Sequence, residues 1–388
     1  MCEKNTNPED ESVEMVSDDS DSDVSMTDSE SSDNEETIND QNETIESEDE
    51  PVEDEEEDEV IKAIRRNAEN KRDHPPPITT EDFITDISFH PHEDIIAIAN
   101  IVGDVGLYKY TNEENTLMES LESHTKACRD VEFSYDGKLN RFYENSHDVP
   151  VYCLTVLDEN LFATGDDDGM VKLWDLRERS DKQIYRIKRN EDYISDIITN
   201  ESKKYLLISS GDGSLLTVDL QNRKFHMQSE EYEEELTCLG IFRGETKLVS
   251  GSSKGKLYLY NWNEFGLHSD AFPGPKTTIN SLVPITENIA VTACEDGNLR
   301  ATHLFPHRHL GVVGQHQLSV ENVDICNTGK FIASSSHNND VKFWNIQYFE
   351  DFEKVSHKHK KHERKKDLEN NLPSSKLKNA SDFFSGLA

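Results

Sequence analysis

The stretch Gly169–Asp175 reads GMVKLWD and decides the fold of this chain. Its apolar residues alternate with polar ones, which places Val171 and Leu173 on the same face of a β-strand. The glycine before the alternation allows a tight turn that leads into the strand. A tryptophan and an aspartate end the stretch. We therefore expect a turn followed by a half-buried strand here.

The same template recurs along most of the chain. Its copies start at Gly103, Gly169, Gly213, Gly255, Gly297 and Asn339, with spacings of 66, 44, 42, 42 and 42 residues. A repeat of 40 to 45 residues with a Trp-Asp ending resembles the WD40 repeat, in which each unit forms one four-stranded blade of a β-propeller. The resemblance implies an all-β WD40 propeller. No helical periodicity separates the expected strands, which excludes a parallel α/β fold.

The first spacing, 66 residues, is too long for one repeat and too short for two. A strand is expected at Asp130–Phe133, but only Lys138–Ser146 remains where two inner strands and their connection belong. We therefore predict seven blades, the second of which is truncated. A six-bladed ring is the alternative. An alternative transcript or an imperfect gene model would also explain the short second repeat.

Composition divides the chain into four zones. Residues 1–60 form an acidic arm, 61–77 a basic and proline-rich linker, 78–350 the propeller, and 351–388 a basic tail. The arm contains 27 of the 79 acidic residues and one basic residue, Lys4. It is almost free of aromatic residues, so we predict that it is disordered, and we predict the same for the tail.

The acidic arm offers candidate phosphorylation sites. An acidic residue follows three positions after each of Ser20, Ser25, Thr27, Ser32 and Ser47. Acidophilic kinases favour this pattern, and phosphate would make the arm more negative still. The arm either solubilises the protein or docks on basic partners such as ribosomal proteins or histones.

The tail carries two signals. Lys354–Lys366 reads KVSHKHKKHERKK, and its candidate nuclear and nucleolar targeting residues are Lys358, Lys360, Lys361, Arg364, Lys365 and Lys366. Such a basic cluster also suits contact with RNA phosphates. The chain then ends in DFFSGLA, where we predict that Phe383, Phe384 and Leu387 form a short docking motif.

Several classes of protein and site are excluded by the sequence. No apolar run is long enough for a membrane helix, and the first residues lack the apolar core of a signal peptide. The six cysteines form no CxxC pair, so we expect neither zinc nor disulfides and infer a reducing compartment. The His-rich part of the tail is interspersed with lysines that repel cations. We predict no metal, no cofactor and no small-molecule substrate.

Two groups of polar residues resemble the structural hydrogen-bond tetrads of WD40 blades rather than a catalytic site. They are His147, Thr164, Asp168 and Trp174 in one repeat, and His316, Ser334 and Trp344 in the last, where Asn338 replaces the aspartate. The chain has no GxSxG, P-loop or HExxH motif. We therefore expect that it is not an enzyme.

Some stretches outside the repeat template resemble one particular family. They are His124–Phe133, Asp158–Gly165, Gly251–Gly255 leading into Asn261–Gly266, and the C-terminal DFFSGL. Together they resemble the WD repeat-containing protein 55 family over about residues 80–388. That resemblance implies a nuclear, mainly nucleolar protein, with some cytoplasmic pool, that supports ribosomal RNA production and large-subunit maturation by binding pre-ribosomal proteins.

A second functional class remains open. Trp174, Asp175 and Arg177 match the WDxR box with which some propellers dock on the adaptor of cullin-4 ubiquitin ligases. The alternative for Arg177 is an ordinary surface arginine. The chain is therefore expected to act as a scaffold in ribosome biogenesis or as a ligase substrate receptor.

Overall fold

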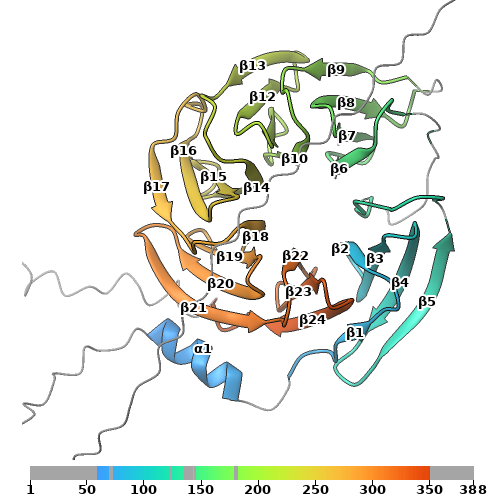
Figure 1. Ribbon diagram of the computed structural model, residues 1–388, viewed down its shortest axis with the longest axis vertical. Coiled ribbons are helices and arrows are strands. Elements are labelled where there is room, and N and C mark those ends of the chain that lie inside the picture. The colour runs from blue at the N-terminus through green and yellow to red at the C-terminus, as the bar shows by residue number, and fades with distance from the viewer. Residues whose placement is uncertain are drawn as a thin grey trace, which may run out of the picture. The chain divides into compact units, whose positions relative to one another are not determined.

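The computed structural model describes residues 59–69, 73–122, 124–134, 143, 146–178 and 182–349. Within these ranges the chain forms one helix, α1 (Glu59–Glu69), and 24 strands. The strands pair into six four-stranded sheets, which Figure 1 shows as the blades of a propeller. Nearly all of the acidic arm and the whole of residues 351–388 lie outside the described residues.

Three of the sheets follow one another in the first half of the described chain. The first contains β2 (Ile84–Phe89), β3 (Ile95–Asn100), β4 (Asp104–Tyr110) and β5 (Asn115–Glu122). The second contains β6 (Val151–Val156), β7 (Leu161–Asp166), β8 (Met170–Asp175) and β9 (Tyr185–Lys188). The third contains β10 (Ile194–Thr199), β11 (Tyr205–Ser210), β12 (Leu215–Asp219) and β13 (Lys224–Gln228). Each is an antiparallel meander.

The second half adds two more meanders and a composite sheet. One meander contains β14 (Leu236–Phe242), β15 (Lys247–Ser252), β16 (Lys256–Asn261) and β17 (Asp270–Pro273). The other contains β18 (Ile279–Pro284), β19 (Ile289–Cys294), β20 (Asn298–His303) and β21 (Arg308–Gln315). The last sheet contains β22 (Val320–Ile325), β23 (Phe331–Ser336) and β24 (Asp340–Asn345), and its fourth strand is β1 (Ile78–Thr79).

The sheets surround a common axis with their first strands innermost. Contacts join β6 to β10, β10 to β14, β14 to β18, β18 to β22, and β22 back to β2. The closure depends on β1, since Ile78 pairs with Val341 and Thr79 with Asp340 in an antiparallel ladder. The two ends of the propeller thus share one sheet, which the sequence pattern did not predict.

Burial falls from the inner strands to the outer ones. Every residue of β11 and of β19 is buried, whereas β5 and β13 are largely exposed. The turns between the second and third strands use the predicted glycines. Gly169 has a φ of +75°, and a Cβ at this position would clash with the carbonyl oxygen of Asn190. The turn at Gly169 therefore requires a residue without a side chain, whereas the last sheet has Asn339, with a φ of +58°, at this position.

The prediction of a seventh, truncated blade is not confirmed. The described residues form six sheets, and no strand is present within residues 124–134. This segment nevertheless bridges its neighbours. Val131 N–H donates to Asp86 Oδ2 of β2 at 2.7 Å, and Leu154 N–H of β6 donates to Asp130 Oδ2 at 2.6 Å. The segment thus connects two innermost strands without forming a sheet, because no neighbouring strand of its own is present among the described residues to pair with it.

Helix α1 lies within the zone that composition assigned to the acidic arm and the linker. Its buried residues, Val60 and Ile64, pack in one core cluster with Leu310 of β21 and with Phe349. Asn67 Nδ2 donates to the carbonyl of Asn345 at 3.2 Å. The linker thus contains a helix anchored to the propeller. Within the described residues, no helix has the length and apolarity required to cross a membrane.

Candidate interaction surfaces

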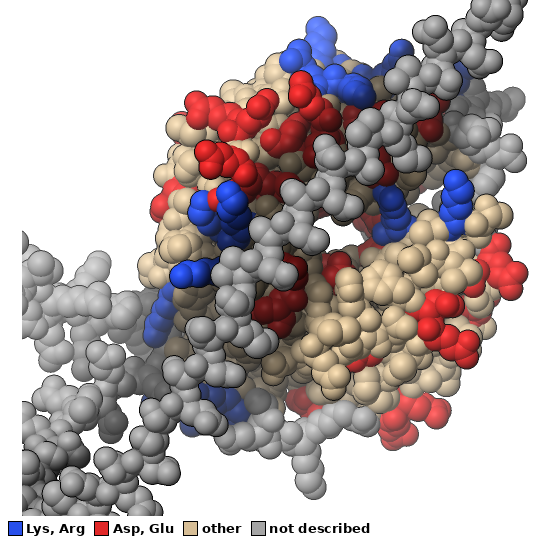
Figure 2. All heavy atoms as spheres, in the orientation of Figure 1, with Lys and Arg blue, Asp and Glu red and all other residues tan. Residues whose placement is uncertain are grey.

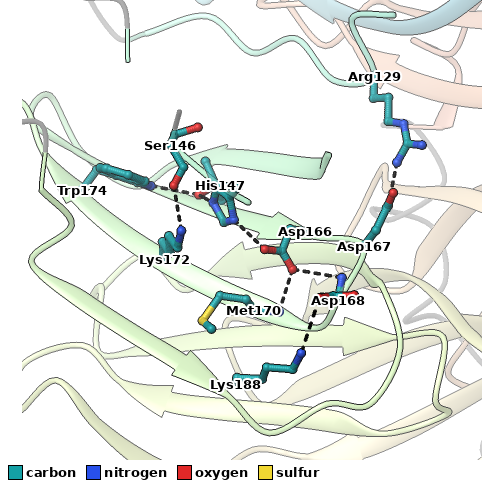
Figure 3. A network of polar contacts seen from close by, with 11 residues as sticks. Arg129, Ser146, His147, Asp166, Asp167, Asp168, Met170, Lys172, Trp174 and Lys188 are labelled. Carbon is teal, nitrogen blue, oxygen red and sulfur yellow. Dashed lines mark hydrogen bonds and ion pairs between the residues drawn. The ribbon is translucent and has the colours of Figure 1, made fainter. Parts of the chain in front are cut away.

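A buried hydrogen-bond chain crosses the sheet β6–β9. His147, in the loop before β6, contacts Thr164 Oγ1 through Nε2 at 2.7 Å and Asp166 Oδ2 through Nδ1 at 2.7 Å. Trp174 Nε1 donates to the same Thr164 hydroxyl at 2.9 Å. Figure 3 shows His147, Asp166 and Trp174 converging from the loop and from two strands. Burial lowers the pKa of His147, which favours the neutral imidazole.

The carboxylate in this hydrogen-bond chain is that of Asp166. The prediction that Asp168 has this role was wrong. Asp166 ends β7 and also accepts the backbone N–H groups of Asp168 and Met170 at 3.0 and 2.9 Å. Asp168 lies in the exposed turn, with its carboxylate 3.7 Å from Lys188 Nζ. Sequence alone could not choose among three consecutive aspartates, because a strand that ends one or two residues later presents a different side chain to the histidine.

The last sheet contains a second chain of the same kind. His316 Nε2 contacts Ser334 Oγ at 2.7 Å, and Trp344 Nε1 donates to that hydroxyl at 2.8 Å. The acid is Asp340, whose Oδ1 lies 3.0 Å from His316 Nδ1. The interpretation that Asn338 replaces the aspartate was therefore wrong, because the first residue of β24 supplies the carboxylate.

Neither of the two hydrogen-bond chains is arranged for nucleophilic catalysis. Ser334 has no exposed surface and Thr164 is 5% exposed, and each hydroxyl already accepts a hydrogen bond from an indole N–H. A nucleophile must reach a substrate atom, and these oxygens reach only their own sheet. Both chains join the loop before a sheet to its second and third strands.

Carboxylates of the inner segments join successive sheets, a feature that the sequence interpretation missed; Asp86 is buried, and Asp130, Asp196 and Asp324 are half-buried. In addition to the Asp86 and Asp130 bonds, Asp196 Oδ2 of β10 accepts from Leu239 N–H of β14 at 2.8 Å. Asp324 Oδ2 of β22 accepts from Phe89 N–H of β2 at 2.7 Å. The available signal was an aspartate followed by an apolar residue inside each of these inner segments, as in Asp196-Ile197.

Burial perturbs these carboxylates. It raises the pKa of Asp196 to about 7 and that of Asp324 to about 6. The pKa of Asp86 is raised well above its usual range, first by burial and then by the neighbouring Asp130 carboxylate. Desolvation penalises the charged form of an acid, and two close carboxyl groups resist double ionisation. The inner strands therefore hold acids whose charge depends on pH near neutrality.

The WDxR residues are ordered, and one of them faces solvent. Arg177 Nε and Nη2 donate to the two oxygens of Asp175 at 2.9 and 2.7 Å, forming a bidentate pair. The Arg177 side chain is 66% exposed, whereas Trp174 is 2% exposed. Trp174 therefore serves the hydrogen-bond chain of the sheet, and only Arg177 is presented to a partner.

The loop between β13 and β14 forms an acidic surface. Its residues Glu230, Glu231, Glu233 and Glu235 are all exposed. Figure 2 shows acidic side chains gathered over the sheets β10–β13 and β14–β17 on the face that is drawn. Carboxylates at this density favour basic partners by long-range attraction.

No metal centre is present among the residues that the structure describes. Cys128, Cys153, Cys238, Cys294 and Cys326 are free and buried, as is typical of cysteine that packs as a small hydrophobe. Burial raises the pKa of Cys128 to about 11 and that of Cys238 to about 12. These thiols are therefore poor nucleophiles and poor metal ligands at neutral pH.

The remaining predicted sites lie outside the described residues. They are the five phosphorylation sites of the arm, the basic targeting cluster within Lys354–Lys366, and the C-terminal Phe383, Phe384 and Leu387. These stay predictions.

Six four-stranded sheets around one axis, a third strand that ends in Trp174-Asp175, and two His-Ser/Thr-Trp hydrogen-bond chains define a WD40-type β-propeller. A family model described as WDR55 matches residues 137–349. The "WD repeat-containing protein 55 homolog" of Aedes aegypti is 53% identical over 352 residues, which cover 86% of this chain and 74% of that protein. The proteins of the same name in Drosophila willistoni and Drosophila melanogaster are 52% and 51% identical over 85% of this chain, covering 69% and 70% of their own lengths. The chain belongs to the WD repeat-containing protein 55 family.

Proposed function

We propose that this propeller is a non-enzymatic scaffold in nucleolar ribosome biogenesis, where it supports ribosomal RNA production and maturation of the large subunit. Membership of the WD repeat-containing protein 55 family carries the proposal. The described site chemistry agrees with a scaffold, because the candidate hydroxyl and thiol nucleophiles are buried.

The scaffold binds proteins through its loops and tails. Pre-ribosomal proteins are rich in lysine and arginine because they contact RNA, and the exposed glutamates of loop 230–235 attract such surfaces. The acidic arm extends the same chemistry. The basic tail supplies nuclear and nucleolar targeting and contact with RNA phosphates.

Affinity purification from nuclei, with and without RNase, tests the scaffold. Recovery of large-subunit precursor proteins in both samples is expected if the propeller contacts proteins directly. Replacing Glu230, Glu231 and Glu233 by lysine should reduce that recovery, whereas the same charge change at exposed Glu113, Glu114 and Glu119 of another sheet should not. Equal recovery with both variants would contradict binding through loop 230–235, and recovery of no precursor protein by the unaltered chain would contradict the scaffold itself.

Microscopy tests the targeting role of the tail. Substitution of the five targeting lysines and of Arg364 by alanine should shift the protein from the nucleolus to the cytoplasm. Unchanged nucleolar signal would remove the tail from the proposal.

A second function is supported by one observation, the exposed and ordered guanidinium of Arg177. In this function the propeller docks on the adaptor of a cullin-4 ubiquitin ligase and presents substrates. Arg177→Ala should abolish recovery of the adaptor, whereas Arg186→Ala, an exposed arginine of β9, should not. If adaptor binding is lost while precursor ribosomal RNA stays normal, the box does not serve the scaffold function.

A further inference from the structure

The outer edge of two neighbouring sheets is basic. β9 and β13 are the outermost strands of the sheets β6–β9 and β10–β13. Residues 182–190 read KQIYRIKRN and residues 222–228 read NRKFHMQ, and the two stretches together contain six lysines and arginines and no acidic residue. Figure 2 shows lysine and arginine side chains gathered at this edge. Such a concentration is unexpected in a chain whose formal net charge is −39.

The two strands present these charges to solvent. Tyr185 and Ile187 of β9 pack on the core that the two sheets share. Arg186 and Lys188 alternate with them, so they lie on the opposite side of the strand, and both are exposed. Lys224, the first residue of β13, is exposed as well. The basic surface therefore extends from one side of β9 across the edge to β13.

An arginine joins the two strands at this edge. Arg189, the residue after β9, places its Cζ atom 3.8 Å from the centre of the Phe225 ring of β13. Arg189 is exposed and Phe225 is 38% exposed. A guanidinium stacked on an aromatic ring is held in place by the cation–π attraction, which reduces the entropy that it loses when it binds a ligand.

Protection of an edge strand explains the presence of charge but not its sign. Charged side chains prevent an outermost strand from pairing with another chain, and either sign serves. The outermost strand β5 reads NTLMESLE and carries only acidic charges. Arg186, Arg189 and Lys224 have no ion pair with any residue that the structure describes, and the Lys188 Nζ atom lies 3.7 Å from Asp168. Largely unpaired charge of one sign on two neighbouring edges therefore indicates an anionic partner.

The aromatic side chains distinguish between anionic partners. Phe225 is partly exposed beside the Arg189 guanidinium, and the next residue, His226, is exposed and stacks on Tyr205 with ring centroids 4.8 Å apart. Unpaired bases stack on aromatic rings and on guanidinium planes, while spaced cations neutralise the phosphates. An acidic protein would use the cations but would gain little from the rings. The combination therefore favours a single-stranded nucleic acid.

We propose that the edge formed by β9 and β13 binds single-stranded RNA. Arg186, Lys188 and Lys224 contact phosphates, and Phe225 with Arg189 stacks on an unpaired base. The choice of RNA over DNA rests on the proposed function in ribosome biogenesis. The inference deepens that function, because it adds an RNA surface on the propeller itself to the contact assigned to the basic tail.

Fluorescence anisotropy with labelled oligouridylate tests the proposal. The full-length chain carries alanine at the six targeting positions of its tail, so that the propeller alone can supply the contact. This chain should bind the RNA, and its affinity should fall as the salt concentration rises. Reversing the charge of Arg186, Lys188 and Lys224 to glutamate should weaken binding about tenfold or more. It should also lower the slope of log affinity against log salt by about 2, since each phosphate contact on a single strand accounts for about 0.7.

A matched control reverses three exposed lysines elsewhere on the propeller, Lys109, Lys276 and Lys330, and should leave the affinity and the slope unchanged. All six positions are exposed, so circular dichroism should show each triple variant folded. A loss of affinity as large in this control as in the edge variant would overturn the proposal, because it would reflect net charge alone.

An uncharged substitution tests the stacking step. Phe225→Ala should weaken binding about five- to tenfold, the lower part of the range for a stacked base, and should leave the salt slope unchanged. Tyr152→Ala removes an aromatic ring of similar exposure, 40%, and should have no effect.

Three further outcomes would each overturn the proposal. They are no binding of oligouridylate by the chain with the alanine tail, unchanged affinity in Phe225→Ala together with displacement of the RNA by poly-glutamate at equal charge, and tighter binding of oligodeoxythymidylate than of oligouridylate. The scaffold function is judged separately, because recovery of precursor proteins after RNase treatment does not depend on RNA bound at this edge.

Discussion

At the scale of single residues, two neighbouring aspartates have opposite roles. Asp166 satisfies His147 and two backbone N–H groups within a buried network, whereas Asp168 faces water near Lys188. The same residue type two positions apart thus gives one structural residue and one surface residue. The difference comes from where β7 ends.

This difference predicts unequal effects of the same substitution. Asp166→Ala removes three hydrogen bonds and leaves buried donors without partners, which should lower the free energy of unfolding by about 2–3 kcal/mol. Asp168→Ala removes one exposed ion pair and should change it by less than about 0.5 kcal/mol. Urea unfolding followed by tryptophan fluorescence measures both. Equal losses in the two variants would contradict the assignment of Asp166.

Asp196 predicts how stability depends on pH. Its pKa in the folded protein is about 7, above the ordinary value near 3.9 in an unfolded chain, so the folded state holds a proton that the unfolded state has lost between these values. The contribution of Asp196 to the free energy of unfolding is therefore most favourable below about pH 4. The free energy of unfolding then falls as the pH rises toward 7. The slope is at most about 1.4 kcal/mol per pH unit, and partial exposure of the group makes it smaller.

Asp196→Asn should flatten this dependence, because the amide oxygen still accepts from Leu239 N–H but carries no charge. Chemical unfolding at several pH values from 5 to 8 measures the change. Asp82→Asn, at an exposed position, is the matched control. An unchanged slope in Asp196→Asn would show that this carboxyl group ionises freely in the folded state.

At the scale of elements, the repeated sheets were predictable and the elements that join them were not. A glycine turn followed by apolar alternation, as in Gly255–Asn261, is a local signal that specifies a strand and its buried face. The two-residue strand β1 has no periodicity of its own, and its partner β24 lies about 260 residues away. The amphipathic pattern of α1 was obscured by the acidic composition around it.

The closing strand β1 makes a testable contribution. Ile78 is 5% exposed and packs in one cluster with Val341 and Phe343. Ile78→Ala should lower the free energy of unfolding by about 2–4 kcal/mol, the usual loss for a buried isoleucine. Hydrogen exchange should also become faster at the amides of β24, because its edge is less well covered. Thr79→Ala, at an exposed position of the same strand, should do neither.

At the scale of the whole molecule, a ring needs each neighbouring pair of inner strands to be joined. Contacts between strands do so around most of the propeller. Between β2 and β6 the connection passes through a segment without a strand. Sequence spacing identified this region as irregular, since the first repeat is too short for two blades. It could not show that the segment bridges β2 and β6, because each of those hydrogen bonds joins residues that lie more than 20 positions apart in the sequence, Val131 to Asp86 and Leu154 to Asp130.

The match to a relative also differs in length on the two sides. The match to the Aedes aegypti protein extends over 352 residues. It includes 86% of this 388-residue chain, and that share amounts to fewer than 352 residues. That relative therefore has residues within the match that have no counterpart here. The six sheets surround one axis, and segment 124–134 is bonded to both β2 and β6.

Two carboxylates of this segment connect it to the next sheet: Asp130 accepts from Leu154 N–H, and Glu132 accepts from Val156 N–H. Asp130→Ala should increase the hydrogen-exchange rate of the Leu154 amide and of its neighbours in β6, while the amides of β18, on the other side of the ring, keep their protection. Asp130→Asn retains an acceptor and should protect Leu154 nearly as well as the native residue. If Asp130→Ala leaves Leu154 protected, the prediction is wrong, and the bonds of Glu132 to Val156 and of Arg129 to Asp167 suffice to hold β6. If exchange increases in β6 alone, the ring opens at this one connection while its five other inner-strand contacts persist.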